Sequence, residues 1–327
     1  MIRSLNRIIK EEACKRKVAL LFAYNGSQFK GSQMQAVEKN LRTVEGVMEQ
    51  ALFQAGCISE SNRHDLEKIK WSRVSRTDKG VHAILTIAGV KIMWDNRCDD
   101  DMIETINQYL PEDVRIFGIR QVTKSFNAKK YADFRVYEYL FPYHSLFPGE
   151  RFSTDKINEL NGYTRLLEGT HLFHNYSKRL TSDLPESKRY IIKFEAHNDP
   201  LHYKGIDFIK FNITGQSFVY HQIRKMLGTS LGILLGKFDK GIIEESFKEP
   251  LIELPLAPAE GLALAQQNFS WYNAAQPHKP IKLKEKEEKA IQEFYINSIV
   301  NTIYSAENVF TSWCEAEFRT PNSISNI

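Results

Sequence analysis

The stretch that decides the fold is SRTDKGVHAILTIAGVKIMW, which occupies residues 75–94. It places one carboxylate, Asp78, between the cations Arg76 and Lys79, and Gly80 follows directly. Asp-Lys-Gly is typical of a turn, because Asp tolerates turn geometry and Gly takes a positive φ. The mostly apolar residues after the glycine predict a strand. The stretch therefore predicts a tight loop that presents a carboxylate at the start of a strand.

Elements on both sides of this stretch complete a first α+β half. From Val44 the apolar residues recur at helical spacing, with Thr43 as the expected N-cap and Gly56 as the end of the helix. The expected order is strand 17–24, helix 44–55, strands 69–75 and 81–94, helix 99–110 and strand 114–122. This β-α-β-β-α-β order is similar to the ferredoxin-like split βαβ arrangement.

A second α+β half and a helical extension follow. We expect strands at 134–141, 190–196, 206–214 and 262–269, and helices at 154–167, 218–237 and 241–247. A helix over 290–318 should pack on this half, and residues 319–327 should be frayed. The fold class is thus α+β, with two tandem ferredoxin-like-derived halves whose antiparallel sheets join across a central basic cleft. The expected domains are an N-terminal arm (1–16), the two halves (17–123 and 124–275) and a C-terminal helical extension (276–327).

Composition and charge narrow the class of protein. Of 327 residues, 42% are hydrophobic and 26% are charged, which is ordinary for a globular protein. No apolar run approaches the roughly 20 residues of a membrane helix. The net charge of +4 permits nucleic-acid binding, as it permits a basic enzyme of another kind. Four scattered cysteines without a Cys-x-x-Cys pair predict no zinc ribbon and a reducing compartment.

Asp78 and the segment 134–139 each allow a structural and a functional interpretation. Asp78 fits a solvated turn, but the cations beside it would hold a carboxylate ionised and attract phosphate. In the predicted strand 134–139, Arg135, Tyr137 and Tyr139 share one face. Such a face is either half-buried structure, or it stacks a nucleic-acid base and holds a phosphate.

The segments 215–228 and 169–178 also contain candidate residues. On the first, His221 and Arg224 lie three apart on a helix that otherwise faces the core. A buried Arg224 would need a carboxylate such as Asp78, whereas an Arg224 at the surface would not. On the second, His171 and His174 have the spacing of two metal ligands. We expect a polar loop near the cleft there and no metal.

These segments together resemble the TruA family of tRNA pseudouridine synthases. Five motifs of that family occur in the family's order over about residues 17–275. They are YNGSQFKGSQ (24–33), SRTDKGVHA (75–83), RVYEY (135–139), SFVYHQIRKMLG (217–228) and APAEGL (257–262). Trp71 and GTHLFHNYSK (169–178) are similar to the eukaryotic tRNA pseudouridine synthase 1 branch. Ile84 departs from the pattern, because smaller residues are common there.

The resemblance implies a role for each matched residue. It implies that Asp78 is the catalytic aspartate, that Tyr137 stacks on the target uracil, and that Arg224 pairs with Asp78. The residues expected to bind the substrate are Arg76, Lys79, His82, Arg135, His174, Lys178 and His221.

The implied reaction converts uridine in tRNA to pseudouridine, with messenger and small nuclear RNA as further candidate substrates. The N1–C1′ bond breaks, the uracil turns, and C5 bonds to the same carbon, so no cofactor is expected. Asp78 acts either as nucleophile at C1′ or as base on the 2′ carbon. We expect a monomer without a membrane partner, located in the nucleus, with the cytoplasm or the mitochondrion as alternatives.

Two other classes of protein fit the sequence less well. A tRNA-binding module without catalysis has no need of the intact set Asp78, Tyr137 and Arg224. A metal-dependent nucleobase deaminase needs a Pro-Cys-x-x-Cys motif, which this sequence lacks.

Overall fold

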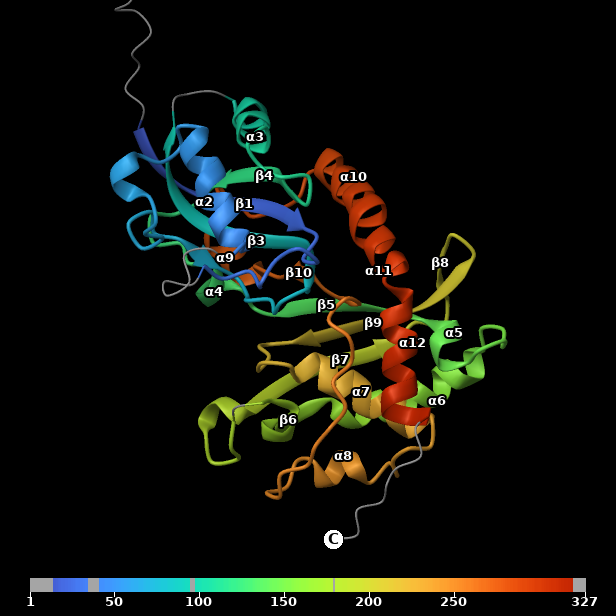
Figure 1. The fold of residues 1–327 in the computed structure, drawn as a ribbon. Coiled ribbons are helices and arrows are strands. Elements are labelled where there is room, and N and C mark those ends of the chain that lie inside the picture. The colour runs from blue at the N-terminus through green and yellow to red at the C-terminus, as the bar shows by residue number, and fades with distance from the viewer. Residues whose placement is uncertain (1–13, 35–40, 95–97, 179, 320–327) are drawn as a thin grey trace, which may run out of the picture. The chain divides into compact units, whose positions relative to one another are not determined.

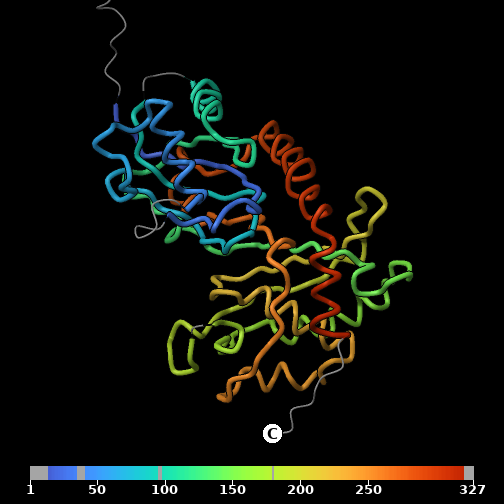
Figure 2. The backbone as a smooth tube through the Cα atoms, in the orientation of Figure 1, coloured from blue at the N-terminus to red at the C-terminus, as the bar shows by residue number. Residues whose placement is uncertain are grey.

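The computed structural model describes residues 14–34, 41–94, 98–178 and 180–319. Most of the predicted N-terminal arm and of the predicted frayed C-terminus lies outside these residues. The chain divides into two compact units, which can be followed along the tube in Figure 2. Unit 1 combines Met1–Asp133 with Gln266–Ile299, and unit 2 combines Phe134–Ala265 with Val300–Ile327. The first division falls after Asp133, ten residues beyond the predicted end of the first half.

Unit 1 is built on an antiparallel sheet with β1 at its centre (Figure 1). Strand β1 (Cys14–Tyr24) pairs with β3 (His82–Trp94) on one side and with β4 (Val114–Gln121) on the other. Strand β2 (Ser72–Arg73) pairs with β3 and is much shorter than the predicted strand 69–75. The main helices of this part are α2 (Val44–Gln54) and α3 (Asp99–Asn107). The predicted order of strands and helices is therefore confirmed here.

Local chemistry explains where α2 begins. The Thr43 side chain accepts a hydrogen bond from Gly46 N at 3.2 Å, as the sequence predicted for an N-cap. Gly56, just beyond the last turn, has φ +72°. Met48, Ala51 and Leu52 are fully buried, so that the apolar stripe of the helix forms part of the core.

The strands of unit 2 pair in the antiparallel order β5-β9-β7-β6, with β8 paired to β9. Its strands are β5 (Arg135–Pro142), β6 (Gly169–Leu172), β7 (Lys188–Ala196), β8 (Leu201–Tyr203) and β9 (Ile206–Gly215). The sequence analysis missed β6 and β8. Helices α6 (Thr154–Thr164), α7 (Gln222–Leu234) and α8 (Ile242–Glu245) also belong to this unit, as do the short helices α5 (Tyr143–Leu146) and η3 (His174–Tyr176). Strand β10 (Leu262–Gln267) begins in unit 2 and ends in unit 1.

The start of α7 differs from the prediction, which placed it at residue 218. His221 has φ +70°, a left-handed conformation that interrupts a helix of L-residues. The Gln222 side chain instead accepts a hydrogen bond from Val219 N at 2.8 Å. Residues 218–221 are therefore a loop that leads into α7.

The C-terminal helical segment is shared between the units and begins at residue 285, earlier than the predicted 290. Helices α9 (Ser270–Ala275) and α10 (Glu285–Phe294) lie in unit 1, where α10 contacts β3 and β4. After η5 (Tyr295–Val300), the helices α11 (Asn301–Ser305), α12 (Glu307–Cys314) and η6 (Glu315–Arg319) lie in unit 2. The prediction that the whole extension packs on the second half is therefore wrong for α10.

The α+β class is confirmed, while the cleft between the halves stays a prediction. None of the described helices combines the length and the hydropathy that a membrane span requires.

Candidate active site

The Asp78 loop forms the turn that the sequence predicted. Val81 N donates to Asp78 O at 3.2 Å, and Gly80 takes φ +82° at the third position of this turn. Asp78 is half-buried, whereas Arg76 and Lys79 are exposed. The loop thus holds its carboxylate near the surface, with two cations beside it in sequence.

Thr77 anchors this loop to the segment that follows β1. Its amide donates to Ser32 Oγ at 2.9 Å, and its carbonyl accepts from Ser32 N at 3.2 Å. Its hydroxyl lies 2.7 Å from the hydroxyl of Tyr24, in the last position of β1. Because Thr77 is buried and held at three atoms, the backbone before Asp78 has little freedom.

Gly26 and His82 hold the other side of the loop. Gly26 N donates to Nδ1 of the fully buried His82 at 2.9 Å, which assigns the ring proton to Nε2. A Cβ atom on Gly26 would lie 2.0 Å from Val81 O, so only glycine fits. Two motifs that are fifty residues apart in the sequence therefore form one rigid support for Asp78. The substrate contact expected of His82 stays a prediction.

In unit 2, the predicted aromatic and basic face of β5 carries Arg135, Tyr137 and Tyr139. Tyr137 is 5% exposed, and its ring meets the edge of Phe218 with 5.2 Å between ring centroids. Arg135 Nη1 donates to Gln216 O at 2.7 Å. Both contacts come from the segment between β9 and α7, so this segment covers the start of β5.

Arg224 lies in the first turn of α7 and is half-buried. Its Nε donates to Ala257 O at 2.6 Å, and its own carbonyl accepts from Ala257 N at 3.3 Å. The same segment reaches β5, because Tyr139 OH donates to Pro258 O at 2.7 Å. Burial raises the pKa of the Tyr139 phenol well above its usual value, while the charge of Arg224 opposes this rise.

Close backbone contacts fix the 255–261 segment between α7 and β5. A Cβ on Gly228 would lie 2.4 Å from Pro255 O, and one on Gly261 would lie 2.5 Å from Leu140 O. The structure therefore brings the arginine helix, the tyrosine strand and the APAEGL motif together within unit 2. Asp78 belongs to unit 1, and its pairing with Arg224 stays a prediction.

His174 and Asn175 lie in a buried network. His174 is 1% exposed, and its Nε2 lies 3.1 Å from Lys248 O. The Asn175 side chain donates to Ser246 O at 3.0 Å and to Pro250 O at 3.1 Å. The contacts seen for His174 are thus internal to the protein, and its contact with substrate stays a prediction.

The other candidates of this unit lie nearer the surface. Lys178 is exposed, and His221 is half-buried and stacks on Tyr220 with 3.7 Å between ring centroids. The other histidine of the His-x-x-His pattern, His171, stacks on Phe247 with 4.0 Å between ring centroids.

Sequence reasoning missed the partners that hold the site and one basic pocket. Phe218, Gln216 and Ser32 contact the candidate residues only because the chain folds back on itself. Lys15 and Lys17 lie two residues apart and so share one face of β1, but the predicted strand began only at residue 17 and left Lys15 in the N-terminal arm.

Comparisons with known proteins agree with this arrangement of motifs. The sequence profile described as tRNA pseudouridine synthase matches residues 164–270. The pseudouridylate synthase 1 homolog of Mus musculus is 33% identical over 313 residues, which cover 91% of this chain and 73% of that protein. Its Homo sapiens counterpart is 33% identical over 302 residues, covering 89% and 69%. The tRNA pseudouridine synthase 1 of Saccharomyces cerevisiae is 28% identical over 345 residues, covering 79% and 62%. The chain belongs to the TruA family of tRNA pseudouridine synthases.

Proposed function

We propose that this protein isomerises uridines of tRNA to pseudouridine and that Asp78 is the catalytic residue. Membership of the family supports the reaction. The observation that carries the role of Asp78 is the rigid loop, in which Thr77, Gly26 and His82 fix the backbone on both sides of a half-buried carboxylate. A group that must meet one carbon of a bound nucleotide benefits from such fixed positioning.

Different residues serve different steps of the proposed reaction. The target base must leave its stack at a cost of a few kcal/mol, and stacking on an aromatic ring such as Tyr137 returns about 1–3 kcal/mol. Asp78 then acts on the ribose in one of two ways. As nucleophile it forms an ester bond at C1′, which breaks again when C5 bonds to that carbon; as base it removes a proton from the 2′ carbon, to which the proton later returns. The N1–C1′ bond breaks, C5 bonds to C1′, and the C5 proton leaves while N1 gains one. Substrate and product are isomers, so the balance needs no other reactant.

The test of Asp78 is the Asp78→Asn variant. We expect it to form no pseudouridine, because the amide can neither attack nor accept the proton, while its affinity for tRNA stays within about twofold of the wild type. Tritium release from 5-³H-uridine tRNA measures turnover, and filter binding measures affinity. Asp183→Asn, a change of an exposed aspartate, is the matched control and should be fully active. Turnover by Asp78→Asn would refute the assignment.

We also propose that Arg224 keeps Asp78 ionised. Arg224→Ala should then lower turnover and move the acidic limb of the pH–activity profile to higher pH, because a nearby cation favours the carboxylate form. Arg224→Lys retains the charge but loses the Nε donor to Ala257 O, and should shift the limb less. If the acidic limb of Arg224→Ala coincides with that of the wild type, the pairing is excluded.

The use of other RNAs, the monomeric state and the nuclear location are further proposals. Chemical mapping of pseudouridine in total RNA, with and without the protein, tests the first. Light scattering on the purified protein tests the second, and imaging of a tagged protein tests the third.

A further inference from the structure

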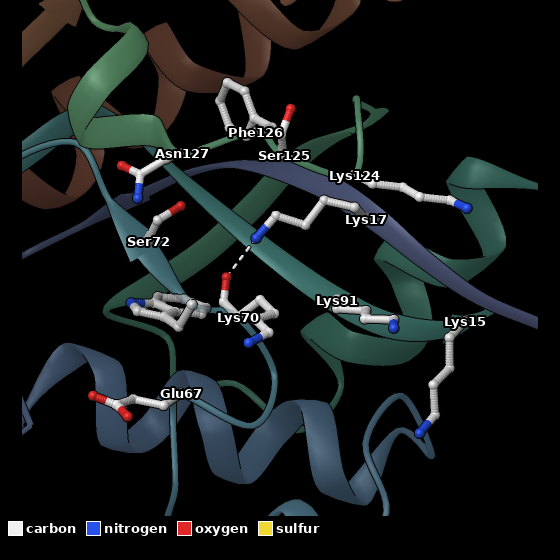
Figure 3. A pocket seen from close by; sticks show the side chains of 11 residues that line it. Lys15, Lys17, Glu67, Lys70, Ser72, Lys91, Lys124, Ser125, Phe126 and Asn127 are labelled. Atoms are coloured by element: carbon white, nitrogen blue, oxygen red, sulfur yellow. Dashed lines mark hydrogen bonds between the residues drawn. The ribbon is translucent and has the colours of Figure 1, made fainter.

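Unit 1 contains a basic pocket with a volume of about 660 Å³ (Figure 3). Among the described residues that line it, Glu67 is the only carboxylate. The lining contains five lysines, which are Lys15, Lys17, Lys70, Lys91 and Lys124. A smaller adjoining cavity shares Lys15 and Lys91 and adds Lys68.

Strand register brings two of these lysines face to face. Lys17 of β1 lies directly opposite Lys91 of β3, and Lys15 lies two residues before Lys17 on the same face. Directly opposed residues have Cβ atoms about 4.5–5.5 Å apart, and like charges there are destabilising. The sheet therefore carries an unfavourable contact at this point when the pocket holds no anion.

Lys17 is the innermost of the group, with 7% of its surface exposed. Its Nζ donates to Lys70 O, as the dashed line in Figure 3 shows. Burial, and then the charge of Lys70, lower the pKa of Lys17 to about 8. Lys70 itself adopts φ +52°, which is unusual for a residue with a Cβ.

The ion pairs of the described residues leave these amines out. In residues 14–34, 41–94, 98–178 and 180–319, none of the five lysines forms an ion pair. Nearby Glu45 is occupied, because it accepts from Trp71 Nε1 at 2.7 Å and pairs with Arg73. The pocket therefore gathers positive charge that forms no ion pair within the described part of the chain.

We propose that this pocket binds phosphates of the RNA backbone away from the nucleotide that reacts. The proposal rests on the proposed function, since it takes tRNA as the ligand. Lysine binds phosphate as a point charge, and an anion between Lys17 and Lys91 would turn their repulsion into attraction to a shared partner. A polyanion would satisfy several of the lysines together.

The position of the pocket defines its role. Along β3, the Asp78 loop lies next to His82, and Lys91 lies nine residues further on, which corresponds to about 30 Å of extended strand. A phosphate in the pocket is thus remote from the reacting uridine. The pocket contributes affinity and orientation for a large RNA and no chemistry.

The first experiment removes two of the exposed lysines, Lys15 and Lys91, as the double serine variant. Kd for tRNA should rise about 5- to 20-fold, and the slope of log K against log salt should fall by about 1.4–1.8. Turnover at saturating tRNA should match the wild type. The control is the double variant Lys240→Ser and Lys282→Ser, which removes the same charge from exposed sites outside the pocket and should change Kd less than about twofold.

The outcomes separate the pocket from the reaction. An equal loss of affinity in both double variants would show that only net charge matters, and an unchanged Kd in the Lys15/Lys91 variant would equally overturn the proposal. Neither result would contradict the proposed function, because turnover at saturating tRNA tests that function separately. Conversely, activity of Asp78→Asn would refute the catalytic assignment and leave the comparison of affinities intact.

The second experiment distinguishes an RNA backbone from free phosphate. Lysine acetylation read by mass spectrometry should show protection of Lys15, Lys70 and Lys91 by tRNA, with Lys240 and Lys282 unprotected. Inorganic phosphate at 1–10 mM should protect them weakly. Protection by inorganic phosphate without protection by tRNA would overturn the RNA assignment.

Discussion

At the residue scale, Lys17 shows how a site for an anion reduces stability. Its amine is buried beside Lys70, and its pKa falls to about 8 in the folded protein. An unfolded chain restores the ordinary value near 10.5, so the unfolded state binds more protons between pH 8 and 10.5. Stability must therefore rise with pH in that window, and the full penalty of the charged amine is present below pH 8.

Lys17→Met should stabilise the protein at neutral pH. The change removes the buried charge and keeps an unbranched side chain. We therefore expect the free energy of unfolding at pH 7 to rise by about 1–2 kcal/mol, after allowance for solvent screening. The gain should vanish as the pH approaches 10.5. Melting temperatures at pH 7 and pH 9.5 measure this, with Lys240→Met on the surface as the control. A loss of stability at pH 7 would contradict the burial penalty.

Residues whose conformation depends on local chemistry were predictable from the sequence. The turn at Asp78 and Gly80 and the cap at Thr43 follow from side chains that bond to their own backbone or permit a positive φ. The left-handed His221 and the buried Lys17 were not predicted. The burial of Lys17 involves Lys70, 53 residues further along the chain, and local propensity does not register such a contact.

At the scale of elements, Asn175 connects the short helix η3 with the loop after α8. Besides its two donated bonds, its Oδ1 accepts from Ile252 N at 2.8 Å, and its carbonyl accepts from Lys225 Nζ of α7 at 2.9 Å. The side chain is 2% exposed, so that water cannot replace these partners. The 246–252 loop is thus fixed by a single amide.

Asn175→Ala should destabilise unit 2 by about 2–4 kcal/mol, because it leaves buried backbone groups without partners. Asn175→Asp keeps the acceptor for Ile252 N but loses the donated bonds, and should also be destabilised. Thermal unfolding followed by circular dichroism measures both. Ser→Ala at exposed Ser61, outside this network, is the control for the measurement. Two variants as stable as the wild type would show that the network is dispensable.

Elements with strong periodicity were predicted well, and short ones were missed. Helix α2 and strands β3, β5 and β9 lie close to their expected bounds, since each has a long apolar pattern. Strands β6 and β8 are only four and three residues long, too short for a period to emerge. They are strands because they pair with β7 and β9, and such pairing cannot be predicted from the residues of the short segments themselves.

At the scale of the whole molecule, the chain does not fold as two consecutive halves. It enters unit 2 at Phe134, returns to unit 1 at Gln266, and enters unit 2 again at Val300. The sequence predicted the α+β class because each unit keeps the local order of strands and helices. It could not predict that the C-terminal helices are divided between the two units. An apolar face shows that a helix packs on something, but not on which unit it packs.

This connectivity predicts the result of a truncation after Ile299. The shortened chain keeps every segment of unit 1 but lacks α12. The ring of Phe310 in α12 is fully buried, and its centroid lies 5.1 Å from that of Phe141 and 6.4 Å from that of Tyr139. Loss of a buried Phe alone costs about 3–5 kcal/mol. We therefore expect β5 and β9 to lose protection in amide hydrogen exchange, while β1 and β3 keep theirs.

Mass spectrometry of exchanged peptides reads both units in one sample, so unit 1 serves as the internal control. Pseudouridine formation should be lost as well, because Tyr137 and Arg224, to which we assign roles in the reaction as a proposal, lie in unit 2. Phe310→Ala in the full chain should give a weaker form of the same pattern, confined to unit 2. Unchanged protection of β5 and β9 in the truncated chain would show that α12 is not part of the core, and simultaneous loss in β1 and β3 would show that the two units unfold as one.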